Sequence, residues 1–71
     1  MLLLFPLGLK AEWKDLREGL EVPAVILAIG QPLIKSRTRA GLFETWTYDR
    51  GGYAVFVRAR LSYWREPRHG P

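Results

Sequence analysis

The chain lacks cysteine altogether and has a single histidine, His69, close to its end. Disulfides and thiolate metal sites are therefore excluded, and a zinc site would need several such ligands close together. With 71 residues, the chain is long enough for one domain, and a domain this small buries only about 60% of its unfolded surface. We therefore expect its stability to come from tight packing or from oligomerisation, with no metal and no cofactor.

A long hydrophobic run is lacking as well. The apolar stretch over residues 1–9 is much shorter than the roughly 20 residues that cross a bilayer, so we predict no transmembrane segment. The stretch is similar to the hydrophobic core of a secretory signal peptide, with Ala11 before a cleavage site; the alternative is an ordered segment that covers the core. We expect a bacterial periplasmic or envelope location if residues 1–11 are a signal remnant, and a cytoplasmic location otherwise.

Acidic side chains are scarce in the second half of the chain. Residues 1–34 carry three basic and four acidic side chains, whereas residues 35–71 carry eight basic and three acidic ones. A basic half favours anionic partners such as nucleic acid, lipid headgroups or an acidic protein face. The alternative is a basic face that is only solvated.

Two short helices are predicted in the first half. Residues 11–18 space their apolar side chains for one helical face, and Gly19 is placed to end that helix. A second helix fits Val22–Ile29, with Pro23 in its first turn and Gly30 as its stop. The alternative for this second, β-branched run is a buried strand.

The second half predicts strands. Residues 42–48 and 53–60 flank a glycine-bearing turn over residues 49–52, which indicates a β-hairpin. A third strand is expected over residues 61–64, after a tight turn near residues 59–60, and Leu33 and Ile34 can start a short strand before the hairpin. The predicted fold is an α+β domain over residues 12–66, with two short N-terminal helices packed on a three-stranded antiparallel sheet and a tail over residues 67–71.

Neither face of the predicted hairpin is polar throughout. The first strand places Trp46 and Tyr48 on one face and Phe43, Thr45 and Thr47 on the other. Two short helices cover one face only, so the other face, or an edge strand, is a candidate surface for a protein partner or a second copy. The alternative is that residues 1–9 cover it. The predicted contact residues are Tyr53, Val55, Val57, Arg58 and Arg60, with Lys35, Arg37 and Arg39 as electrostatic guides.

Several small motifs follow one another in a recognisable order. They are Trp13, Leu16, Gly19, Leu20, Gly30 and Pro32, and then Glu44, Trp46, Tyr48, Gly51, Gly52, Phe56 and Leu61. This order resembles the small envelope domains of the SmpA/OmlA (BamE-like) family over residues 12–64. The resemblance implies the two-helix, three-stranded fold and a non-catalytic, protein-binding role in outer-membrane assembly. The chain departs from the family in having no lipobox cysteine, in Leu20 where Met is usual, and in Ala59-Arg60 at the glycine turn.

No catalytic constellation is visible in the sequence. Ser36 and Ser62 have no histidine away from the chain end to act as a base. Gly51 and Gly52 mark a turn, because neither a phosphate-binding loop motif nor a following helix accompanies them. We therefore predict that the protein is not an enzyme.

Nucleic-acid binding is the alternative function. Arg58 and Arg60 share strand parity with Phe56, and aromatic side chains lie on neighbouring strands, where aromatics stack bases and arginines hold phosphates. The same aromatics are also what a small core needs, and the core interpretation is favoured for Trp46 and Tyr48.

Overall fold

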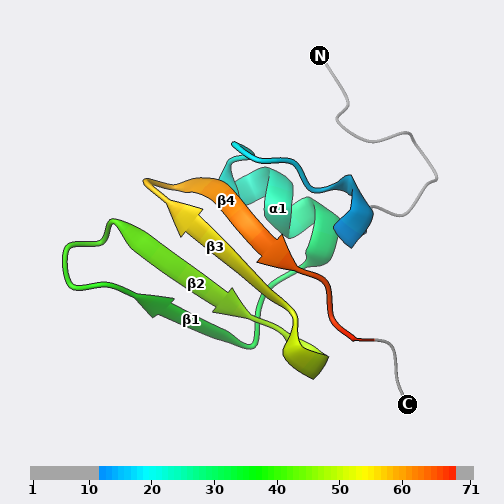
Figure 1. Cartoon of the computed structure of the whole chain (residues 1–71). Coiled ribbons are helices and arrows are strands. Elements are labelled where there is room, and N and C mark those ends of the chain that lie inside the picture. Colours follow the sequence, from blue (N-terminus) through cyan, green and yellow to red (C-terminus); the bar gives the residue numbers. More distant parts are fainter. Residues whose placement is uncertain (1–11, 69–71) are drawn as a thin grey trace.

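A computed structural model describes residues 12–68, which form one α-helix against one face of a four-stranded antiparallel sheet (Figure 1). The predicted signal remnant over residues 1–11 and the last three residues of the predicted tail lie outside the described residues. The strands are neighbours in chain order. The elements are α1 (Val22–Ile29), β1 (Ile34–Arg37), β2 (Phe43–Thr47), β3 (Tyr53–Val57) and β4 (Arg60–Arg65).

The helix α1 confirms the prediction for this segment, and the alternative of a buried strand is wrong. Pro23 occupies the first turn, where a missing N–H costs no intrahelical hydrogen bond. Gly30 ends the helix with a φ of 81°, and its N–H donates to the Ile26 carbonyl at 2.8 Å. Val25 and Ala28 are buried and turn the same side of the helix toward the sheet.

The first predicted helix is wrong. The chain makes only a single 3-10 turn, η1 (Trp13–Asp15), in which the Asp15 carboxylate accepts the Glu12 N–H at 2.8 Å. Leu16 is already extended, with φ −71° and ψ 148°. A helix this short depends on tertiary packing for its stability, and here the extended chain places Leu16 in the core at 3% exposure instead.

The extended segment after η1 also covers one edge of the sheet. The Gly19 N–H donates to the Leu61 carbonyl at 2.7 Å, and the Leu61 N–H donates to the Leu20 carbonyl at 2.8 Å. Gly19 has a φ of 93°, a conformation that glycine adopts at little steric cost. The first half of the β4 edge is therefore paired with backbone from the same chain.

The predicted three-stranded sheet is also wrong, because residues 34–37 add a fourth strand. β1 pairs with β2, and the Thr38 N–H donates to the Phe43 carbonyl at 2.9 Å to hold the connecting turn. All four residues of β1 are exposed. The short strand expected to start at Leu33 and Ile34 is confirmed in part, since β1 begins at Ile34, but its lack of buried side chains gives no sign that it belongs to the sheet.

The β2–β3 turn and the β3–β4 turn each contain residues other than glycine with positive φ. In the β2–β3 turn, η2 (Asp49–Gly51), Arg50 has a φ of 54°. In the β3–β4 turn, Arg58 and Ala59 have φ values of 52° and 67°. Positive φ at both central residues is the requirement of a type I′ turn, which usually holds Asn-Gly. The turn therefore lies one residue earlier than the predicted residues 59–60.

The core lies between α1 and the sheet face that carries Trp46 and Phe56, whose rings are 4.5 Å apart between centroids. Tyr48 joins the end of β2 to the end of α1, because its hydroxyl donates to the Gly30 carbonyl at 2.7 Å. Trp13 packs edge-on against the Tyr48 ring at 5.1 Å. Burial raises the pKa of Tyr48 to about 12. The core interpretation of Trp46 and Tyr48 fits these contacts.

Candidate protein-contact surface

The sheet has a second face, opposite α1, over which no other element of residues 12–68 lies. The strand register places it: Thr45 is opposite Val55, and Val55 is opposite Tyr63, whereas Trp46 and Ala54 pair on the core side. We call this surface the open face. Its members are Ile34, Ser36, Phe43, Thr45, Thr47, Tyr53, Val55, Val57, Arg60, Tyr63 and Arg65.

The open face exposes large apolar and aromatic side chains. Ile34, Phe43 and Tyr63 are 59%, 45% and 55% exposed. The Tyr63 ring stands edge-on to the Tyr53 ring, with 6.3 Å between the centroids. A hollow of about 380 Å³ opens beside them, with threonines and Val55 in its lining. Exposed aromatic side chains around a shallow hollow are typical of protein contact surfaces.

A β-bulge in β4 gives Tyr63 its place on this face. Leu61 pairs with Phe56 and Tyr63 pairs with Val55, so Ser62 is an extra residue between them. Without the extra residue, strict alternation would turn Tyr63 to the same side as Leu61, into the core. The bulge therefore keeps Leu61 buried while it presents a tyrosine on the open face.

The structure brings three of the predicted contact residues together. Tyr53, Val55 and Val57 follow one another along the open side of β3. Arg60, the first residue of β4, is paired with Val57 at the end of that row, and Arg58 lies in the β3–β4 turn beyond it. Arg60 is also engaged within the chain, because its guanidinium lies 3.2 Å from the Glu21 carboxylate and donates to the Gly19 carbonyl at 3.2 Å.

The three predicted electrostatic guides lie elsewhere. Lys35 and Arg37 project from the side of β1 that also carries the core, where the Lys35 ammonium is 4.9 Å from the Trp46 ring centroid. The Arg37 guanidinium lies 3.6 Å from the Glu44 carboxylate. Arg39 is exposed in the β1–β2 turn. The predicted set is therefore divided between the two sides of the sheet.

Sequence reasoning missed the exposed aromatic and apolar members of the open face. The position of Phe43 could be predicted from strand alternation, since it stands on the strand face opposite Trp46. The position of Tyr63 could not be predicted, because the bulge that reverses the direction of its side chain leaves no pattern in the sequence. Arg65 was also missed; its guanidinium carbon is 5.9 Å from the Tyr53 ring centroid.

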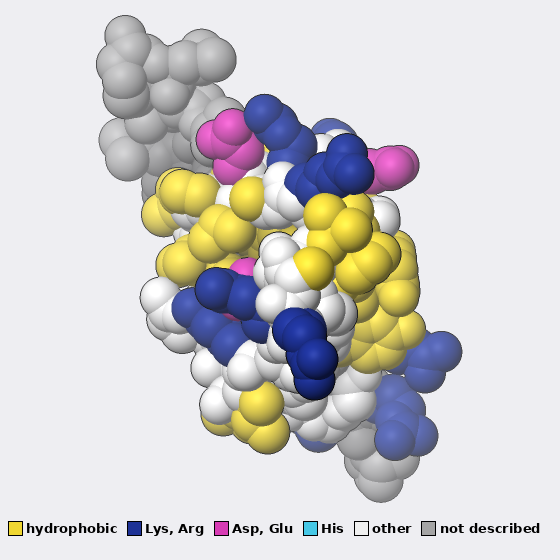
Figure 2. Space-filling model, turned by 90° about the vertical axis from the view of Figure 1, so that its left-hand side faces the viewer, with side chains coloured by type: hydrophobic (Ala, Val, Ile, Leu, Met, Phe, Trp, Pro, Cys, Tyr) yellow, Lys and Arg dark blue, Asp and Glu magenta, His cyan; other side chains and the backbone are white. Residues whose placement is uncertain are grey.

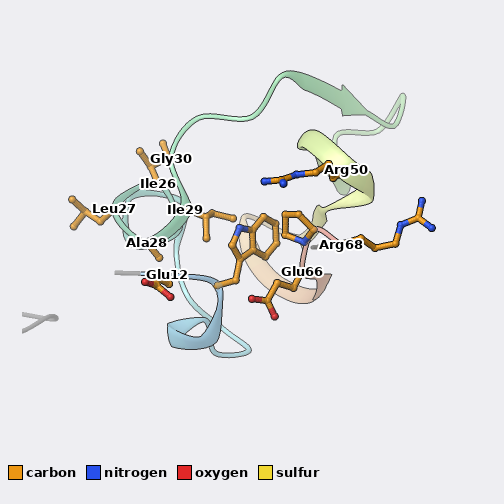
Figure 3. Close-up of a pocket in the computed structure, with 11 residues that line it drawn as sticks. Glu12, Ile26, Leu27, Ala28, Ile29, Gly30, Arg50, Glu66 and Arg68 are labelled. Atoms are coloured by element: carbon orange, nitrogen blue, oxygen red, sulfur yellow. The ribbon is translucent and has the colours of Figure 1, made fainter. Parts of the chain in front are cut away.

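A second concave region, a groove of about 720 Å³, lies between the C-terminal end of α1, η1 and residues 66–68 (Figure 3). Ile29 points into this groove and Arg50 reaches toward it from η2, while Leu27 points away (Figure 3). Its lining contains two glutamates and two arginines but no serine, threonine, cysteine or histidine. Among residues 12–68, the groove therefore offers no side-chain hydroxyl, thiol or imidazole that could act as a nucleophile.

Within residues 12–68, no three side chains of the His, Cys, Asp or Glu type stand together as a metal-ion site would require. In the same part of the chain, no helix is both long and apolar enough to cross a bilayer.

The chain shows no match to protein-family models, to curated proteins or to solved structures. The resemblance to the SmpA/OmlA family and the expected location therefore stay predictions.

Proposed function

We propose that this protein is a non-catalytic binding module that contacts a protein partner through the open face. The observation that supports this most is the exposure of Ile34, Phe43 and Tyr63 on one sheet face, over which no element of residues 12–68 lies. Burial of such side chains is the main favourable term in protein association.

The placement of charge favours a protein over a nucleic acid. Phosphate contacts supply most of the affinity for nucleic acids, so cations must stand beside the aromatic rings that stack bases. Here Lys35 and Arg37 project from the opposite side of the sheet, and Arg60 already pairs with Glu21. At the end of the molecule that carries the β1–β2 and β3–β4 turns, the cationic side chains stand in several separate groups (Figure 2).

Nucleic-acid binding stays the second candidate because of one contact. Arg65 lies over the Tyr53 ring on the open face, with Tyr63 edge-on beside it. Aromatic rings beside a cation are the groups on which single-stranded nucleic acids stack.

The proposal is tested by site-specific photo-cross-linking in the cells that express the protein. One variant carries a photoreactive phenylalanine analogue in place of Tyr63, on the open face. The control carries it in place of Leu27, which is 66% exposed on α1 and lies on the other side of the molecule. We expect discrete protein adducts from position 63 and none from position 27. Their mass then distinguishes a second copy of this chain from a different protein.

Equal adducts from both positions, or none from position 63, would contradict the proposal. A circular dichroism spectrum of each purified variant shows that the fold has survived the substitution. Because both side chains are exposed, neither replacement disturbs the core.

A further inference from the structure

The unpaired edge of the sheet at β1 is a second surface to which a partner can bind. β1 is the edge strand on one side of the sheet and β4 on the other. The two edges differ, since residues 19–21 pair with β4 at Leu61 and Arg60. No segment of residues 12–68 other than β2 pairs with β1. We call the unpaired side of Ile34–Arg37 the β1 edge.

The hydrogen-bond pattern shows which backbone groups the β1 edge offers. Thr38 and Phe43 form a hydrogen-bonded pair, and such pairs alternate along an antiparallel ladder. In the register of β1 and β2, Ile34 and Ser36 therefore bond inward to β2. The N–H and C=O groups of Lys35 and Arg37 point away from the sheet, and they are the groups that an added strand would use.

The side chains of β1 give this edge a chemical preference. Lys35 and Arg37 stand on one side of the strand, and Ile34 and Ser36 stand on the other. A neighbouring strand places its own alternate side chains level with these two rows. An added strand is therefore complementary when one of its rows is acidic and the other is apolar or small.

We propose that the β1 edge binds an extended peptide segment with alternating acidic side chains, which adds as a further antiparallel strand. The main-chain groups of Lys35 and Arg37 provide the pairing, and their cationic side chains select the acidic row. The proposal shares Ile34 and Ser36 with the open face, but it rests on the main-chain groups and cations of Lys35 and Arg37, which are not part of that face. Cations on an edge strand also protect it against pairing with other strands. If that is the role of Lys35 and Arg37, the peptide will not bind.

The probe is a short synthetic peptide, blocked at both ends, in which Glu alternates with Val and Thr. A control peptide has the same charge but is built of Glu-Glu-Pro-Pro repeats, so that proline interrupts the row of N–H groups along either edge of the strand. Binding to the whole chain is followed by amide hydrogen exchange in nuclear magnetic resonance. At saturating peptide we expect the Lys35 and Arg37 amides to exchange at about one tenth of their rate in the free protein or more slowly, because they become hydrogen-bonded.

Two variants separate charge from strand pairing. Replacement of both cations with glutamine, K35Q/R37Q, should weaken peptide binding by about threefold to tenfold, the loss expected for two partly exposed ion pairs. Arg39→Gln removes a cation from the adjacent turn and should leave binding within about twofold. Arg37→Pro removes an outward N–H and should abolish the protection of the Lys35 amide.

Proline at position 37 leaves the bonds to β2 in place, since the N–H of Arg37 points outward. The exchange measurement on the unmodified chain does not depend on whether this variant folds. Three results would overturn the proposal: no binding of the alternating peptide, equal binding of the proline-interrupted peptide, or binding without protection of the Lys35 and Arg37 amides. None of these results bears on cross-linking from the open face.

Discussion

The β3–β4 turn carries a conformational cost that a single substitution should remove. Ala59 has a φ of 67° and is exposed, and its neighbour Arg58 has a φ of 52°. The left-handed conformation costs a residue with a Cβ about 1–2 kcal/mol. Glycine at the same position avoids that cost but loses about 0.5–1 kcal/mol through the greater freedom of the unfolded chain. We therefore expect Ala59→Gly to raise the free energy of unfolding by about 0.5–1 kcal/mol.

Thermal unfolding followed by circular dichroism measures this gain directly. For a domain of this size, 1 kcal/mol corresponds to about 4–8 °C in Tm, so the expected rise is about 2–8 °C. The matched control is Ala40→Gly, in the exposed β1–β2 turn, where φ is not positive. At position 40, glycine only increases the conformational freedom of the unfolded chain, so Tm should fall. If Ala59→Gly lowered Tm as much as Ala40→Gly does, the left-handed turn would be refuted.

Three further outcomes are expected. Because the pKa of Tyr48 is raised to about 12, its contribution to stability is complete below pH 10 and is lost as the pH rises from 10 toward 12. Chemical denaturation across that range should show a steeper decline for the wild type than for Tyr48→Phe. Gly52→Ala places a Cβ 2.6 Å from Pro67 Cγ, which should lower the free energy of unfolding by about 1–3 kcal/mol. Measured by thermal unfolding, this loss should be smaller in a Pro67→Ala background than in the wild type. Phe56→Ala, at 1% exposure, should cost about 3–5 kcal/mol in the same assay, and a loss below 1 kcal/mol would contradict its place in the core.

The sequence predicted α1 and the strands β2 to β4 because local signals agreed there. Pro23 and Gly30 bracket an apolar run of helical period, and Gly51 marks the hairpin turn. In each case the residues that start and stop the element lie beside it in the chain. Such signals do not depend on distant contacts.

The errors came from elements that distant contacts define. Residues 11–18 have a helical apolar spacing, but the chain is already extended at Leu16, and Gly19 and Leu20 pair with β4 at Leu61. The four residues of β1 carry no burial pattern and become a strand only through β2. The direction of Tyr63 depends on a bulge that pairing with β3 creates.

The same limits apply to the candidate surface. The row of Tyr53, Val55 and Val57 follows from strand alternation alone, so the sequence could identify it. The separation of Lys35 and Arg37 from that row follows from the register between β1 and β2, which no local signal contains. Prediction from the sequence therefore combined basic and aromatic residues that lie on different sides of the sheet.

The central claim is that the open face contacts protein and not nucleic acid. It is tested most directly by nuclease treatment of the cross-linked adduct from position 63, followed by measurement of its mass. The account predicts an adduct heavier than the single chain whose mass nuclease leaves unchanged, because the exposed residues of that face are mainly apolar and aromatic. An adduct that nuclease shortens, and that forms less as salt rises before irradiation, would contradict it and assign Arg65 and Tyr53 to a nucleic-acid site.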